Sequence, residues 1–133
     1  MEANVERTVV EFSRASDEGA APFVELIQRL FAAGVERYHA DLVRSEKTYY
    51  LPNGDSHVVK VAPIDVPAAK ELSAAGVEAA IRSSQAGQIR YKEFCERVLA
   101  AGCVGYVVSL AGRRAVYYGR TGETFVEPFP GAK

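Results

Sequence analysis

The sequence predicts one α+β domain that arose by internal duplication of an α-α-β-β-β unit. Three observations support this fold class: the length, a self-match within the chain, and a change from helical to strand-like patterning inside each half. With 133 residues, 48% of them apolar and 25% charged, the chain has the size and balance of one ordinary globular domain. We therefore expect a single domain over residues 1–133.

The duplication is visible when the chain is shifted along itself by 68 positions. The segment FVELIQRLFAAGVERYHADL then falls on YKEFCERVLAAGCVGYVVSL without a gap. Residues 9–60 and 77–128 are identical at 15 of 52 positions, where average composition would give roughly 3. The first repeat spans about 3–61 and the second about 73–128, with a linker over about 62–72 that contains two prolines.

Each repeat begins with two predicted helices. In the first repeat, apolar residues recur at helical spacing between positions 5 and 12, and the polar stretch 16–19 ends that helix. The next helix starts near Pro22 and carries an apolar stripe at i, i+3, i+4, i+7 and i+8 from Phe23. Gly34 follows, where a left-handed residue would end the helix.

The second repeat shows the same pattern. A helix is expected over 76–84 with Gly87 as its stop, and a second helix carries an apolar stripe from Tyr91 to Leu99. Gly102 takes the place of Gly34, and β-favouring residues follow at once.

Three short strands follow the helices in each repeat. We expect them at 35–43, 47–51 and 56–61, and at 103–111, 114–119 and 124–127. Asn53-Gly54 and Thr121-Gly122 mark equivalent tight turns. Neither helix pair with its three-stranded meander makes an adequate core alone, so the repeats should pack together about a pseudo-two-fold axis.

Composition excludes several classes of function. The formal charge is −1 with no block of like charges, which argues against a general nucleic-acid or anionic-membrane binder. The start lacks the features of a signal peptide, and no run of 18 apolar residues occurs, so a cytoplasmic protein is expected. Cys95 and Cys103 lie outside any C-x-x-C pattern and are predicted to be buried, reduced thiols.

Two longer stretches carry a family resemblance: AAGVERYHADLVRSEKTYY with NGDSHVV, and IRSSQAGQIRYKEFCERVLAAGCVGYVV with VEPFP. They resemble the YdfO-like family of small bacterial proteins, a family of unknown function sometimes labelled phage-envelope-like. The resemblance covers nearly the whole chain and implies a compact α+β fold. It brings no established activity, cofactor or catalytic residue.

Residue types kept in both repeats should serve the shared fold, whereas polar residues in one repeat alone point to another role. The first meander is the polar one, and alternation places Arg37, His39 and Asp41 on one face of its first strand. The candidate ligand-binding set is completed by residues of the second and third strands: Arg37, His39, Asp41, Lys47 and His57.

Three functions remain open from the sequence. The leading hypothesis is a non-enzymatic module that binds a small ligand or a protein partner through the polar face of the first meander. The alternative is a small hydrolase or metal-assisted enzyme with His39, Asp41 and His57 in acid/base or ligand roles. The third is a structural protein that forms a homo-oligomer through an exposed sheet, so both monomer and homodimer are open. No cofactor or resident metal is expected, because no phosphate-binding loop, dinucleotide fingerprint or zinc spacing occurs.

Overall fold

A computed structural model describes residues 1–19 and 23–129 of the chain. Its first half contains two helices and three strands: α1 (Ala3–Glu18), α2 (Phe23–Ala32), β1 (Arg37–Asp41), β2 (Glu46–Tyr50) and β3 (Ser56–Lys60). The second half repeats this order: α3 (Ala74–Gln85), α4 (Tyr91–Ala100), β4 (Cys103–Ser109), β5 (Arg114–Gly119) and β6 (Thr124–Pro128). The α+β class predicted from the sequence is confirmed.

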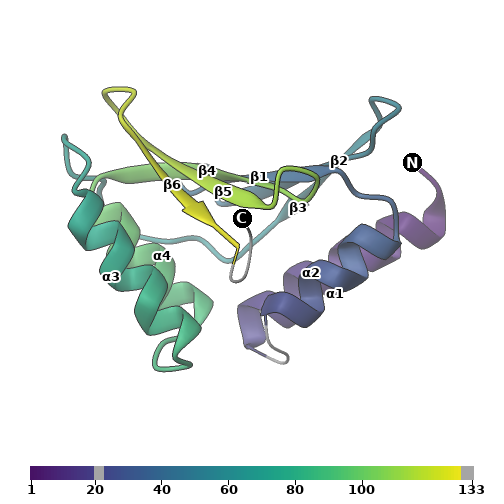
Figure 1. Ribbon diagram of the computed structural model, residues 1–133, viewed down its shortest axis with the longest axis horizontal. Helices are drawn as coiled ribbons and strands as arrows, with labels where there is room; N and C mark the ends of the chain where they lie inside the picture. Colours follow the sequence, from purple (N-terminus) through teal and green to yellow (C-terminus); the bar gives the residue numbers. More distant parts are fainter. Residues whose placement is uncertain (20–22, 130–133) are drawn as a thin grey trace.

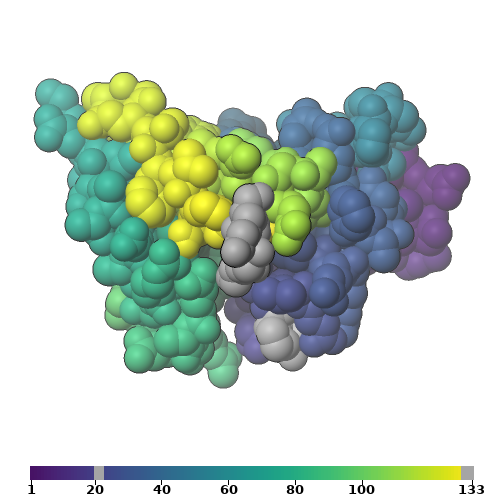
Figure 2. All heavy atoms as spheres, viewed as in Figure 1, coloured from purple at the N-terminus to yellow at the C-terminus, as the bar shows by residue number. Residues whose placement is uncertain are grey.

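All six strands form one antiparallel sheet in the order β3-β2-β1-β4-β5-β6. Both helix pairs cover the same face of this sheet, α1 and α2 beneath the β3 side and α3 and α4 beneath the β6 side (Figure 1). In the space-filling view the two helix pairs form separate lobes below the sheet (Figure 2). None of the described helices lies on the opposite face of the sheet, so we call it the outer face.

The halves meet through β1 and β4. His39 lies directly opposite Val107, which is also the residue 68 positions further along the chain. This register is the one expected if a two-fold axis passes between the two central strands. Ring contacts agree with it: the Tyr38 and Tyr49 centroids lie 5.2 Å apart, and those of Tyr106 and Tyr117, their counterparts, lie 5.1 Å apart.

The core lies between the sheet and the helices. A continuous aromatic cluster contains one phenylalanine from each helix pair, Phe12 of α1 and Phe94 of α4. The other members are the tyrosines on the inner face of the sheet: Tyr38, Tyr49, Tyr106 and Tyr117. Tyr38 and Tyr106 join the two halves of the cluster across the central strands, with centroids 6.4 Å apart. Cys95 and Cys103 are buried in this core with free thiols, as the sequence predicts.

Helix ends follow the glycine signals in both halves. Gly34 and Gly102 have φ of 94° and 92°, the left-handed region that lets the chain leave a helix and enter a strand. They differ in surroundings: a Cβ at Gly34 would meet nothing within 4 Å, whereas one at Gly102 would lie 2.1 Å from the Glu71 carbonyl oxygen. The linker between the halves is therefore packed tightly against the end of α4.

Several boundaries differ from the sequence expectation by a few residues. The first strand of each half is shorter than predicted because a side chain ends it: Asp41 accepts hydrogen bonds from the amides of Val43 and Arg44, and Ser109 Oγ accepts one from Gly112. α3 begins two residues early because the Ser73 hydroxyl caps it, accepting from the Gly76 amide. The expected helix start at Pro22 lies outside the described residues.

Candidate functional site at Lys47

The five residues predicted to form a site do not share one face of the sheet. Along β1, Arg37, His39 and Asp41 alternate with buried residues and lie on the outer face. Lys47 is buried on the inner face, between the partly buried Glu46 and Thr48. His57 pairs in register with Tyr49, and therefore it too lies on the helix side. The single polar face expected from the sequence is corrected, because alternation along β2 and β3 places two members inside.

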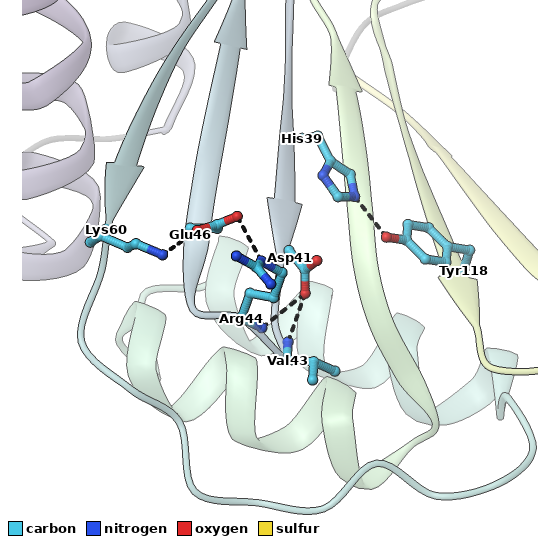
Figure 3. Close-up of polar contacts among 7 residues, drawn as sticks. All are labelled: His39, Asp41, Val43, Arg44, Glu46, Lys60 and Tyr118. Carbon is cyan, nitrogen blue, oxygen red and sulfur yellow. Dashed lines mark hydrogen bonds and ion pairs between the residues drawn. The ribbon is translucent and has the colours of Figure 1, made fainter.

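His39 is held by a tyrosine of the other half. Its Nε2 lies 2.6 Å from the Tyr118 hydroxyl, with the two rings stacked at 5.8 Å (Figure 3). Gly105 leaves the space for this contact, since a Cβ there would lie 2.3 Å from the Tyr118 hydroxyl oxygen. His39 thus bonds across the junction of the halves.

Asp41 and Arg37 are also engaged locally. One Asp41 oxygen, Oδ1, accepts from the amides of Val43 and Arg44 and shapes the β1–β2 turn (Figure 3). Arg37 lies over the Tyr50 ring, 4.3 Å from its centroid. These contacts engage both side chains in the local structure of the sheet and its turn.

His57 pairs with α1. Its Nδ1 lies 3.1 Å from Glu6 Oε2 at the edge of the sheet. His39, Asp41 and His57 therefore do not converge, and the acid/base arrangement considered from the sequence is not assembled. Within residues 1–19 and 23–129, no three His, Cys, Asp or Glu side chains come together in a group that could hold a metal ion.

Lys47 is the exception among the five, because its charge is buried. Its side chain is 1% exposed, and Nζ lies 3.9 Å from Asp17 Oδ1 and 4.1 Å from the centroid of the Tyr91 ring. Among the described residues, neither Lys47 Nζ nor Asp17 Oδ1 has a hydrogen-bond partner, although both atoms are buried. Buried polar atoms are almost always paired in folded proteins, so this unpartnered pair requires an explanation.

A cavity of about 120 Å³ adjoins the pair. Four parts of the fold enclose it: the end of α1, the β1–β2 hairpin, the segment after β3 and the start of α4. Its charged or reactive lining residues are Asp17, Asp41, Glu46, Lys47, Tyr91, Lys92 and Cys95. Most of the remaining wall is aliphatic: Ala40, Leu42, Val61, Ala62 and Ile64.

Burial shifts the ionisation of the groups at this cavity. It lowers the pKa of Lys47, an effect that the Asp17 carboxylate only partly opposes. Burial likewise raises the pKa of Asp17, against the opposing influence of Lys47. The pKa of the Cys95 thiol is raised to about 12, again chiefly by burial. The site thus combines an amine that gives up its proton more readily than usual with a thiol that keeps its own.

In the second half, the position equivalent to Lys47 is occupied by an uncharged residue. The residue 68 positions after Lys47 is Ala115, and the counterpart of Val61 is Phe129. Phe129 packs edge-on against Phe23, the counterpart of Tyr91, with centroids 6.2 Å apart. The fold therefore accepts alanine and aromatic packing here, and the lysine is specific to the first half.

Sequence reasoning named Lys47 and Asp41, which both line the cavity, but did not place the other neighbours of Lys47 beside it. Asp17, Tyr91 and Cys95 were missed because they come from two helices in different halves. One signal was present: Lys47 stands two residues before the core residue Tyr49, so strand alternation alone points it inward.

The described residues contain no helix that is both long and apolar enough to cross a membrane. Comparison with known proteins gives a family. The family described as "Protein of unknown function (DUF1398)" matches residues 9–127, which is most of the chain and includes Lys47 and its neighbours. The chain belongs to this family. The narrower YdfO-like resemblance stays a prediction.

Curated relatives share a shorter segment. The uncharacterized protein Rv2012 of Mycobacterium tuberculosis strain H37Rv and the uncharacterized protein Mb2035 of Mycobacterium bovis are each 38% identical over 50 residues. That segment is 38% of this chain and 30% of each relative, so the similarity spans less than a third of their length. Neither name assigns an activity.

Proposed function

We propose that this protein is a non-enzymatic small-molecule-binding module whose site is the cavity at Lys47. The observation that carries the proposal is the pair of buried polar atoms, Lys47 Nζ and Asp17 Oδ1, which lack hydrogen-bond partners beside that cavity. A ligand with a hydrogen-bond acceptor and a donor would satisfy both atoms at once.

The energetic argument favours a functional lysine over a structural one. An unpaired buried polar group costs about 1–3 kcal/mol. The second half avoids this cost with Ala115 at the equivalent position. Retaining an amine there is therefore unfavourable for the fold alone, whereas it would supply a directed donor to a bound molecule.

The size and charge of the cavity restrict the ligand. A volume of about 120 Å³ suits a molecule with a handful of non-hydrogen atoms, since a cavity of roughly 150 Å³ holds benzene. The nearby carboxylates are engaged: Glu46 pairs with Arg44 and Lys60, and Asp41 accepts from turn amides. A small, neutral, partly apolar ligand fits these walls best.

Binding can be tested by NMR with simple probes. We would titrate isotopically labelled protein with 2-propanol and acetamide, which are small, neutral and able to donate and accept. Shift changes should concentrate on residues of the β1–β2 hairpin, α4 and the segment after β3. They should be lost in Lys47→Met and kept in Lys60→Met, a matched change of an exposed lysine in the same meander. Weak shifts spread over the surface, equal in all three proteins, would refute the proposal.

The other functions have less support. The hydrolase hypothesis needs His39, Asp41 and His57 together, and they lie on opposite faces of the sheet. A protein partner or a second copy on the outer face stays an untested alternative to the cavity. Two buried free thiols are compatible with the cytoplasmic location expected from the sequence.

A further inference from the structure

We propose that Lys47 binds its ligand covalently, by forming an imine with a small neutral aldehyde or ketone held in the cavity. This inference rests on the proposed binding function and adds the chemical class of the ligand. It is carried by the geometry of three groups: a buried amine without hydrogen bonds, a carboxyl oxygen 3.9 Å away, and a cavity beside both.

A lysine forms an imine only when its amine is neutral, and the surroundings of Lys47 favour that form. Asp17 of α1 is the one carboxylate paired with it among the described residues. The Tyr91 ring face and the Cys95 thiol approach from α4, while Asp41, Glu46 and Lys92 line the same cavity. Burial lowers the pKa of Lys47, and this loss of hydration outweighs the opposing influence of the Asp17 carboxylate and the Cys95 thiol.

Asp17 is placed to carry the protons of the reaction. It first takes a proton from the Lys47 ammonium, which leaves a neutral amine and a neutral carboxyl group. The amine lone pair then forms a bond to the carbonyl carbon, and the carbonyl π pair moves to oxygen. Protonation of that oxygen by Asp17 and transfer of a nitrogen proton give a carbinolamine. Loss of its hydroxyl group with the last nitrogen proton forms the C=N bond and releases one water, so amine and carbonyl become imine and water without oxidant or reductant.

The cavity selects against two rival outcomes. The Cys95 thiol would compete for a carbonyl only as a thiolate, and its pKa of about 12 keeps it protonated. A ligand carboxylate would meet the acidic side chains Asp17, Asp41 and Glu46 with Lys92 as the remaining cation of the lining. Short aliphatic aldehydes and ketones avoid both problems and match the apolar walls.

The test is reductive trapping with propanal. The full-length protein would be incubated with propanal and cyanoborohydride at neutral pH, and the adducts would be located by peptide mass spectrometry. We expect a single propyl group on Lys47, loss of that adduct in Lys47→Met, and its retention in Lys60→Met. In Asp17→Asn the adduct should form more slowly while 2-propanol still shifts the cavity resonances. Circular dichroism of each variant checks that the fold is intact.

The outcomes separate this inference from the function on which it rests. Cavity shifts with 2-propanol but no trapped adduct on Lys47 would overturn imine formation and leave the binding site in place. Equal labelling of Lys47, Lys60 and Lys92 would also overturn it, since the environment would then confer no reactivity. Absence of both cavity shifts and adduct would refute the two proposals together.

Discussion

Replacing Lys47 with methionine is the most direct measure of what the buried amine costs the fold. Methionine keeps an unbranched apolar stem of nearly the same length, and it removes the unpartnered Nζ. Removal of the unpaired donor should raise the free energy of unfolding by about 1–3 kcal/mol. Loss of the Tyr91 ring contact removes about 0.5–2 kcal/mol, and the attraction to Asp17 is weakened already because that side chain is 34% exposed.

The expected result is a modest gain in stability. We predict that the free energy of unfolding of Lys47→Met exceeds that of the wild type by about 1 kcal/mol near neutral pH, the difference between the relieved cost of the unpaired donor and the lost ring contact. Urea denaturation followed by circular dichroism measures this difference. Lys60→Met is the control: Lys60 is 70% exposed and pairs with Glu46 at the surface, so its loss should change stability by about 0.5 kcal/mol or less.

The pH dependence supplies a second, independent readout. The folded-state pKa of Lys47 lies below its ordinary value of 10.5. Between those two pKa values the unfolded chain binds the proton and the folded chain does not, so wild-type stability gains with rising pH in that window. The slope is at most about 1.4 kcal/mol per pH unit, and the methionine variant lacks it. The advantage of the variant should therefore shrink as the pH is raised toward 10.5.

Buried tyrosines lower stability as the pH rises, the opposite of the effect of Lys47. Their contribution is the same in the wild type and the variant, so it cancels in this comparison. Burial raises the pKa of Tyr38 and Tyr106, so their contribution is present below the ordinary tyrosine pKa and is lost as pH rises toward the raised values. Both proteins contain them. A variant less stable than the wild type by more than about 1 kcal/mol would refute the reasoning, because Lys47 would then be a satisfied structural group.

Three further predictions concern the fold. Gly34→Ala should lower the free energy of unfolding by about 1–2 kcal/mol, and Gly102→Ala should lower it by several kcal/mol more. Both glycines have positive φ, but only a Cβ at Gly102 would meet the Glu71 carbonyl. Equal losses in urea denaturation would contradict the packing of the linker. Because burial raises its pKa, the Cys95 thiol should not react with a thiol reagent at neutral pH in the native protein and should react once the protein is unfolded; rapid labelling of the native state would contradict its burial. A chain ending at residue 66 should not fold cooperatively, because β1 then loses β4 as its neighbour; a sharp thermal transition in that fragment would show that the half is a domain by itself.

Local signals determined most of the fold from the sequence. The four helices and six strands follow from apolar periodicity, and Gly34 and Gly102 mark the helix ends because few other residues adopt positive φ at low cost. The i, i+4 pairs Glu25–Arg29 and Glu93–Arg97 form as their spacing predicts. All of these features depend on neighbours a few positions apart in the chain.

Polarity was a weaker guide than alternation at the candidate site. Lys47 and His57 were grouped with the outer-face residues because they are polar, yet the pleat of β2 and β3 turns both toward the helices. Strand geometry decides the face, and a polar side chain that falls on the inner face is buried whatever its preference.

The sequence by itself determined the elements, their order and the difference between the halves at Lys47 and Ala115. The tertiary structure alone decided that Asp17 of α1 and Tyr91 of α4 lie beside that lysine and that a cavity adjoins it. The physical reason is that contacts between segments distant in the chain depend on how two helix layers pack over one sheet. Apolar periodicity along the chain does not indicate that packing.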